Sequence, residues 1–186
     1  MSRHRPRASG HSATSPAKRE PLLRGIRAAG NSRAVRRLYV ETYGCQMNVA
    51  DTELIMGTLG QHGYARVETP DEADVILLNT CAIREHAEER IIGRLGALAR
   101  HKSRAGVKIG ITGCMAQHLR AVIRERAPHV DLLVGPDGYR HLPALLEDDA
   151  DDPHVGLRLD PNETYEDLPV ARTSGVRAWV TIMRGC

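Results

Sequence analysis

The sequence of 186 residues contains no phenylalanine, and aromatic residues make up only 3% of it. A hydrophobic core must therefore consist mainly of aliphatic side chains and methionine. Uninterrupted apolar runs all fall short of the roughly 20 residues that a membrane-spanning helix needs, so we expect a protein that does not cross a membrane. Phosphate-binding loops of the GxGxxG and Walker types are also missing, which leaves the familiar modes of nucleotide binding without support.

Basic charge is concentrated at the N-terminus. Residues 1–37 hold ten Lys or Arg and one acidic residue, whereas the remainder holds sixteen basic and twenty-two acidic residues. The segment is rich in Arg, Ser, Gly and Pro, and we predict a disordered tail. It could be an extension without a specific role, a nucleic-acid-binding arm or an organellar transit peptide. No apolar secretory segment follows it, so we expect a cytoplasmic protein with reduced thiols.

Strand-like and helix-like patterns alternate over residues 38–147. Strands are expected over residues 37–43, 75–78, 107–112 and 130–135, and helices over residues 48–63, 115–127 and 139–149. A further long helix after the second strand has an apolar face formed by Ala87, Ile91, Leu95 and Leu98. This alternation predicts an α/β fold with an open parallel sheet flanked by helices. Residues 148–177 have the composition of a linker with one or two short strands, and residues 178–183 begin a new unit with a strand.

All four cysteines of the chain lie just beyond the ends of expected strands. Cys45, Cys81 and Cys114 each precede a predicted helix, and Cys186 is the last residue. Ligands of parallel sheets gather beyond the carboxyl ends of the strands, so the first three thiols should meet at one edge. The residues before them, Gly44, Thr80 and Gly113, are small enough to let a bulky inorganic group approach the backbone.

Three thiolates at one edge indicate a metal centre with one position left open. A soft sulfur donor set selects zinc or an iron–sulfur cluster. Structural zinc sites normally use closely spaced pairs of ligands, whereas these cysteines are separated by 36 and 33 residues. A 4Fe–4S cluster held by three cysteines would leave one iron open for chemistry. The simpler alternative is that three cysteines at the edge of the core have no shared role.

Other polar residues could support such a site. Asn48 and Asn79 flank cysteines and could hydrogen-bond to a cluster or substrate, although Asn is more common in caps and turns. We expect Asn48 to cap the first helix and Gly63 to follow its C-terminus. Four basic residues on the second helix could contact phosphate or form an ordinary solvated face: Arg90, Arg94, Arg100 and Lys102.

Four motifs around the cysteines resemble those of a known family. They are YGCQMN (43–48), NTCAIRE (79–85), GITGCMAQ (110–117) and AWVTIMRGC (178–186). Together they are similar to the N-terminal part of the radical-SAM methylthiotransferases, over residues 38–186. The Gln-Met-Asn sequence after the first cysteine resembles the branch that modifies isopentenyladenosine in tRNA. The branch acting on a ribosomal protein tends to carry Lys-Asn there, and the threonylcarbamoyl-adenosine branch Lys-Val-Asn.

The resemblance implies a role for each cysteine. Cys45, Cys81 and Cys114 match the ligands of an auxiliary 4Fe–4S cluster, and Cys186 matches the first cysteine of the CxxxCxxC motif that holds the radical-SAM cluster. The implied reaction uses S-adenosylmethionine and an electron donor, and adds a methylthio group to C2 of N6-isopentenyladenosine next to the tRNA anticodon. Residues 178–186 would then begin a truncated radical-SAM barrel, and we expect the chain alone to be inactive. Two alternatives are a ribosomal-protein methylthiotransferase of the same family and a non-enzymatic iron–sulfur or zinc-binding module.

Overall fold

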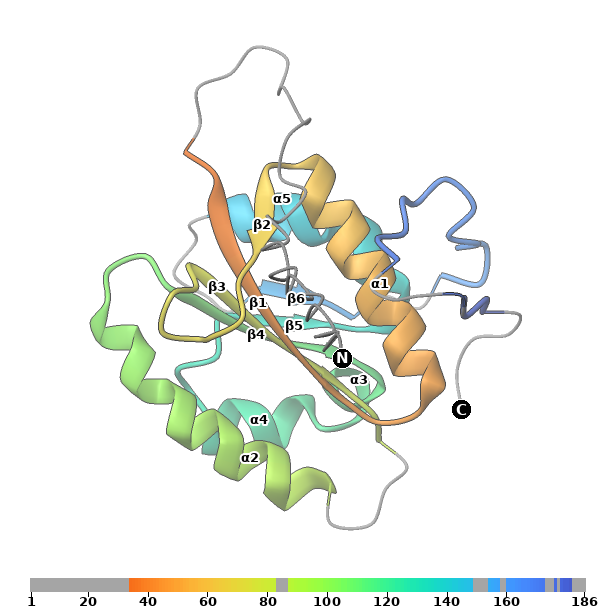
Figure 1. Cartoon of the computed structure of the whole chain (residues 1–186). Coiled ribbons are helices and arrows are strands. Elements are labelled where there is room, and N and C mark those ends of the chain that lie inside the picture. The colour runs from red at the N-terminus through yellow and green to blue at the C-terminus, as the bar shows by residue number, and fades with distance from the viewer. Residues whose placement is uncertain are drawn as a thin grey trace, which may run out of the picture. The chain divides into compact units, whose positions relative to one another are not determined.

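Six parallel strands form one sheet within the part of the chain that the computed structural model describes, namely residues 34–82, 87–148, 154–157, 160–172, 176 and 178–181. The spatial order is β2-β1-β3-β4-β5-β6 (Figure 1). The strands are β1 (Arg36–Tyr43), β2 (Tyr64–Arg66), β3 (Val75–Thr80), β4 (Lys108–Gly113), β5 (Leu132–Val134) and β6 (His154–Gly156). The α/β fold with an open parallel sheet, predicted from the alternating pattern, is therefore confirmed.

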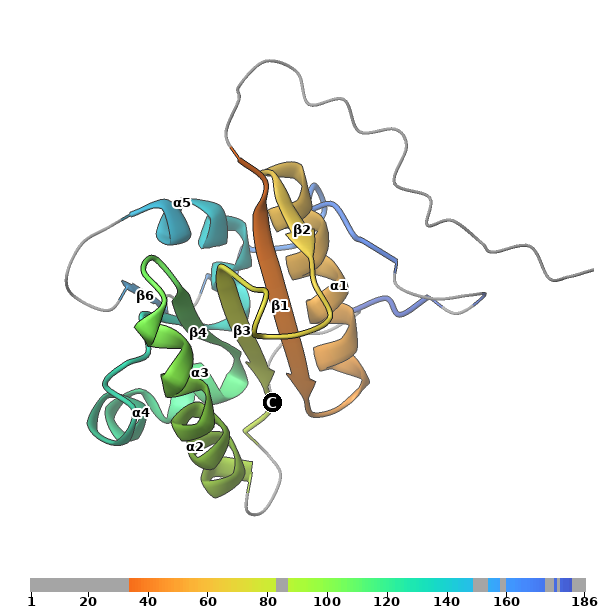
Figure 2. The ribbon, with the colours of Figure 1, turned by 60° about the vertical axis from the view of Figure 1, so that its left-hand side comes forward.

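Helices cover both faces of this sheet. One face carries α1 (Gln46–Gln61), the 3-10 helix η2 (Pro136–His141) and α5 (Leu142–Glu147). The other carries α2 (Ala87–Leu98), α3 (Cys114–His118) and α4 (Arg120–Arg126), with the 3-10 helix η1 (Ala99–Ser103) continuing α2. Figures 1 and 2 show the two groups on opposite sides of the strands. Each group closes its own hydrophobic core against the sheet.

The central strand β3 contributes to both cores. Val75 and Leu77 pack with the α1 side, and Ile76 and Leu78 pack with the α2 side, because successive side chains of a strand point to opposite faces. Every residue of β3 is buried. A continuous apolar run is typical of a parallel strand covered on both faces.

Several element boundaries differ from the sequence prediction. Helix α1 begins at Gln46 with Cys45 as its N-cap, so Asn48 lies inside the first turn and is not the cap. The predicted helix over residues 115–127 is two helices, α3 and α4, because the non-helical ψ of 22° at Leu119 interrupts it. The short strand β2 was not predicted, and Gly63 does follow the C-cap of α1, with a φ of +84°.

The two ends of the domain also differ in detail from the expected division. Strand β1 includes Arg36 and Arg37, which the composition assigned to the tail, and residues 1–33 lie outside the described residues. Within the expected linker, residues 160–165 bond to η2, and residues 169–172 lie beside α1. Over residues 178–181 the described chain forms no strand, and the rest of the strand expected over residues 178–183 lies outside the described residues.

Candidate metal centre

The strands that precede the first three cysteines are neighbours in the sheet and end in register. Tyr43 of β1 pairs with Thr80 of β3, and Thr80 pairs with Gly113 of β4. Cys81 directly follows the last residue of β3, and Cys114 directly follows the last residue of β4. Cys45 lies two residues after the last residue of β1. The backbone N–H of Cys81 donates to the carbonyl of Tyr43 at 3.0 Å, which extends the pairing of β1 with β3 as far as Cys81. The sheet thus brings three cysteine-bearing backbone segments to one edge.

The three thiols differ in their surroundings. Cys45 is exposed at the N-cap of α1, Cys81 is buried with 6% of its surface exposed, and Cys114 is intermediate at the first position of α3. Among the described residues, no group of three or more His, Cys, Asp or Glu side chains is placed to hold a single metal ion. Cys186, the fourth predicted ligand, lies outside the described residues.

Two glycines that precede cysteines allow the chain to turn tightly at this edge. Gly44 has a φ of +149° and Gly113 a φ of +90°, conformations that residues with a side chain rarely adopt. A Cβ at position 44 would lie 2.2 Å from Asn48 Oδ1 and 2.7 Å from the Cβ of Cys81. Protein atoms therefore occupy the space beside Gly44. Both glycines serve the close approach of protein atoms, whereas the sequence suggested room for an inorganic group.

A network of two buried side-chain amides and two more exposed hydroxyls lies directly behind the cysteine edge. Asn48 and Asn79, with 3% and 0% of their surfaces exposed, form a hydrogen bond from Asn48 Nδ2 to Asn79 Oδ1 at 3.1 Å. Asn79 Nδ2 donates to the Asn48 carbonyl at 2.8 Å and to Thr52 Oγ1 at 3.0 Å. Thr52 Oγ1 in turn shares a hydrogen bond of 2.7 Å with Thr42 Oγ1. Asn48 Oδ1 accepts the backbone N–H of Cys45 at 3.3 Å and its thiol at 3.6 Å.

The basic residues of α2 that we considered as phosphate ligands have partners within the protein. Arg94 forms an ion pair with Glu41 of β1, and the guanidinium of Arg90 lies 5.3 Å from the ring centre of Tyr43. Burial favours a higher pKa for Glu41, but hydrogen bonds from Arg94, Tyr43 and Tyr39 outweigh it and lower the pKa. Burial, reinforced by the hydrogen bond to Glu41, raises the pKa of Tyr43 to about 12. This cluster fixes the end of β1 just before Gly44.

The two basic residues that follow α2, Arg100 and Lys102, also lie near acidic side chains. Lys102 Nζ lies 2.7 Å from Asp131 Oδ1 and donates to the Val107 carbonyl at 2.9 Å. Arg100 is exposed, with its Nη2 3.8 Å from Asp71 Oδ1. Arg94 and Lys102 therefore form ion pairs within the fold, which differs from the solvated face that the sequence offered as the ordinary alternative to phosphate contacts.

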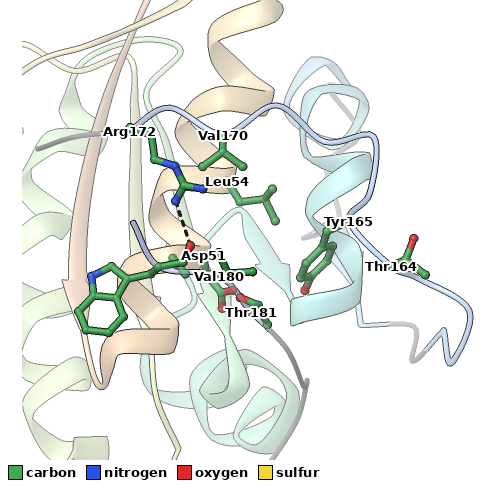
Figure 3. Close-up of a pocket in the computed structure, with 10 residues that line it drawn as sticks. Asp51, Leu54, Thr164, Tyr165, Val170, Arg172, Val180 and Thr181 are labelled. Carbon is green, nitrogen blue, oxygen red and sulfur yellow. Dashed lines mark hydrogen bonds between the residues drawn. The ribbon is translucent and has the colours of Figure 1, made fainter. Parts of the chain in front are cut away.

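A separate pocket of about 190 Å³ lies between α1 and two segments of the chain, residues 164–172 and 179–181 (Figure 3). Arg172 closes one side, since its Nη1 donates to the Trp179 carbonyl and to Glu53 Oε2, both at 2.9 Å. Asp51 lies at the base and accepts a hydrogen bond of 3.0 Å from the hydroxyl of Tyr139. Burial raises the pKa of Asp51 to about 6, against the opposing effect of that hydrogen bond. The pocket therefore lies where the C-terminal part of the described chain packs on α1.

Within the described part of the chain, no helix combines the length and apolar character required to cross a membrane. Residues 37–135 match a family described as "Uncharacterized protein family UPF0004". Among curated proteins, the mitochondrial tRNA methylthiotransferase CDK5RAP1 of Rattus norvegicus is 48% identical over 176 residues, covering 89% of this chain and 29% of the relative. The tRNA-2-methylthio-N(6)-dimethylallyladenosine synthase of Chlorobium luteolum is 42% identical over 153 residues, covering 81% of this chain and 34% of the relative.

The chain spans about a third of the length of these curated relatives. The family match covers more than half of the chain, including all three cysteines at the sheet edge. The resemblance to tRNA methylthiotransferases that the cysteine motifs predicted is confirmed by the relatives. The chain therefore belongs to the protein family UPF0004.

Proposed function

We propose that this chain is the part of a tRNA methylthiotransferase that holds an auxiliary 4Fe–4S cluster through Cys45, Cys81 and Cys114. One observation carries the proposal: three adjacent parallel strands end in register, and each is followed by a cysteine. The names of the relatives supply the reaction class.

The residues at the edge fit such a group in donor type and number. Three thiols offer the soft sulfur ligands that iron–sulfur clusters use, and each would bind a different iron atom. When bound, the cluster would supply one iron with an open coordination position. The chain's own contribution is to hold three backbones in fixed register, while the exposed side chain of Cys45 can turn toward the others.

The remaining parts of the reaction are also proposals. Cys186 would be the first ligand of a second, radical-SAM cluster, and S-adenosylmethionine would be the cosubstrate. The proposed substrate is tRNA carrying isopentenyladenosine beside the anticodon, with an electron donor as a further partner. The proposed location of the protein is the cytoplasm. Because mammalian relatives are named mitochondrial, the transit-peptide alternative for residues 1–37 stays open.

The cluster assignment can be tested on the 186-residue chain by anaerobic reconstitution with iron and sulfide. Each change of Cys45, Cys81 or Cys114 to Ala should cut bound iron sharply, because each removes one thiolate ligand. Cys186→Ala is the matched control, since it removes a thiol of the same chain and should leave the iron of one cluster in place. Iron retained by the triple variant at the parental level would refute the assignment. Zinc bound without iron–sulfur absorption would favour a zinc module instead.

The substrate can be tested separately in a strain that lacks its own tRNA methylthiotransferase. The complete gene that encodes this chain should restore the 2-methylthio group on isopentenyladenosine, as measured by mass spectrometry of digested tRNA. Unchanged tRNA together with a modified ribosomal protein would assign the chain to the other branch of the family.

A further inference from the structure

Two asparagines on different elements connect the cysteine-bearing segments through the interior. Asn48 lies in the first turn of α1, and Asn79 lies next to the end of β3. Their side chains form two mutual hydrogen bonds: Asn48 Nδ2 donates to Asn79 Oδ1, and Asn79 Nδ2 donates to the Asn48 carbonyl. Burying two amides costs free energy unless their polar atoms are paired, and here the pairing joins the helix to the strand.

The orientation of both amides is fixed by backbone groups. Asn79 Nδ2 must face the Asn48 carbonyl, because a carbonyl oxygen can only accept. Asn79 Oδ1 therefore faces Asn48 Nδ2, and Asn48 Oδ1 faces the N–H of Cys45, which can only donate. This series of hydrogen bonds is compatible with only one orientation of the two side-chain amides, because a backbone acceptor fixes one end and a backbone donor fixes the other.

The same two amides also lie close to the glycines that precede Cys45 and Cys114. Asn48 Oδ1 lies so close to Gly44 that a Cβ there would approach it to 2.2 Å, and the same Cβ would meet Cys81. Asn79 Oδ1 lies beside Gly113, where a Cβ would approach it to 2.8 Å. Backbone segments at all three cysteines are thus in contact with this pair, either directly or through one glycine.

We propose that Asn48 and Asn79 are positioning residues that hold the backbones at Cys45, Cys81 and Cys114 in the arrangement a cluster requires. The inference rests on the proposed function, because it assigns the amide pair to the same three ligands. The pair fixes the N–H of Cys45, and the exposed thiol would exchange its 3.6 Å hydrogen bond to Asn48 Oδ1 for a bond to the cluster. A helix cap alone would need Asn48 and no partner on β3, so capping does not account for Asn79.

Two threonines of α1 provide a mild variant and its control. Thr52 Oγ1 accepts a hydrogen bond from Asn79 Nδ2, whereas Thr58 Oγ1 is buried without a hydrogen-bond partner among the described residues. Thr52→Val and Thr58→Val therefore make the same chemical change on the same helix, and only the first removes a member of the network. Asn79→Ala is the stronger variant, because it removes all the hydrogen bonds that the Asn79 side chain makes to Asn48 and Thr52 of α1.

The experiment uses the 186-residue chain reconstituted without oxygen, and measures iron loss to a chelator and the EPR spectrum of the reduced cluster. Loss of groups that orient metal ligands typically costs 10-fold or more in metal affinity, so Asn79→Ala should lose iron about 10-fold faster than the parent. Thr52→Val should lose iron a few-fold faster with a changed EPR line shape, and Thr58→Val should match the parent. Urea denaturation of the apo forms reports any general loss of stability.

Each outcome decides the question. A fall in apo stability with parental iron-loss rates and EPR spectra would show that the network only supports packing, and would overturn the inference. Should Asn79→Ala fail to fold, the contrast between Thr52→Val and Thr58→Val decides in its place, and equal iron loss from these two overturns the inference. A parent chain that binds no cluster would refute the proposed function, and the inference with it. Iron bound by the parent and lost at equal rates from all variants would refute the inference alone.

Discussion

Helices α1 and α2 both pack on the central sheet, but they bury different kinds of side chain. Helix α2 faces the sheet with aliphatic residues, and its polar residues stay at least partly exposed. Helix α1 buries four polar residues beside its aliphatic ones: Asn48, Asp51, Glu53 and Thr58. One helix thus has a single apolar face, whereas the other carries buried polar groups along its length.

The difference follows from what covers each helix. Helix α1 is covered on one side by the sheet and η2 and on the other by residues 169–172. Three of its buried polar side chains each bond to a different element: Asn48 to β3, Asp51 to η2 and Glu53 to Arg172. Apolar contacts of α2 stabilise the fold without a strong preference for position, whereas hydrogen bonds have fixed partners and geometry. Helix α1 thus has specific polar contacts both with β3, behind the cysteine edge, and with residues 169–172.

Asp51 offers the largest expected effect on the α1 side. Because burial raises its pKa to about 6 from an ordinary 3.8, Asp51 is protonated in the folded chain and ionised in the unfolded chain between these values. The unfolded state then binds fewer protons, so stability falls as the pH rises from about 4 to about 6. At pH 7 the deficit amounts to at most roughly 3 kcal/mol. Asp51→Asn should therefore stabilise the apo chain at pH 7.

Urea denaturation at pH 7 and at pH 4.5 checks this expectation. The variant keeps an acceptor for the Tyr139 hydroxyl, so the gain should shrink toward zero as the pH falls below the raised pKa. A variant less stable than the parent at pH 7 would mean that the ionised carboxylate is itself a favourable part of the α1 contacts.

The contrast between the helices also explains which parts of the fold were predictable. The aliphatic spacing of Ile91, Leu95 and Leu98 identified the buried face of α2 correctly. The apolar run of β3 identified a central strand in the same way. For α1, the residues that bond to Asn79, Tyr139 and Arg172 come from distant parts of the sequence, and no local pattern reveals such partners.

The candidate site was predictable to a similar degree. A cysteine after each of three strands, combined with the rule that parallel strands end at one edge, was enough to place the three cysteine-bearing backbone segments at one edge. Among the described residues the thiols themselves do not form a metal-binding group, so their joint role stays a prediction. The register Tyr43–Thr80–Gly113 and the amide pair behind it depend on how the strands align, which composition and periodicity do not determine. Gly44 and Gly113 offered a signal, because glycine before a functional residue often marks a positive φ or a close backbone approach.

Glycines within the two helices give a direct test of how differently these helices are covered. A Cβ at Gly57 of α1 would lie 2.1 Å from the carbonyl oxygen of Pro169, whereas a Cβ at Gly93 of α2 meets nothing within 4 Å among the described residues. Gly93→Ala should stabilise the chain by roughly 0.5–1 kcal/mol, because alanine loses less backbone entropy in a helix. Gly57→Ala brings the same propensity gain but forces residues 169–172 away from α1, at an overpacking cost of about 1–3 kcal/mol. Gly60→Ala is the control within α1 itself, since position 60 is also open and should behave like position 93.

Urea denaturation of the three apo variants measures their free energies of unfolding, and limited proteolysis should cut Gly57→Ala faster between residues 160 and 172. Equal stabilisation by Gly57→Ala and Gly60→Ala would mean that the segment leaves α1 without cost, and that α1 is no more tightly covered than α2.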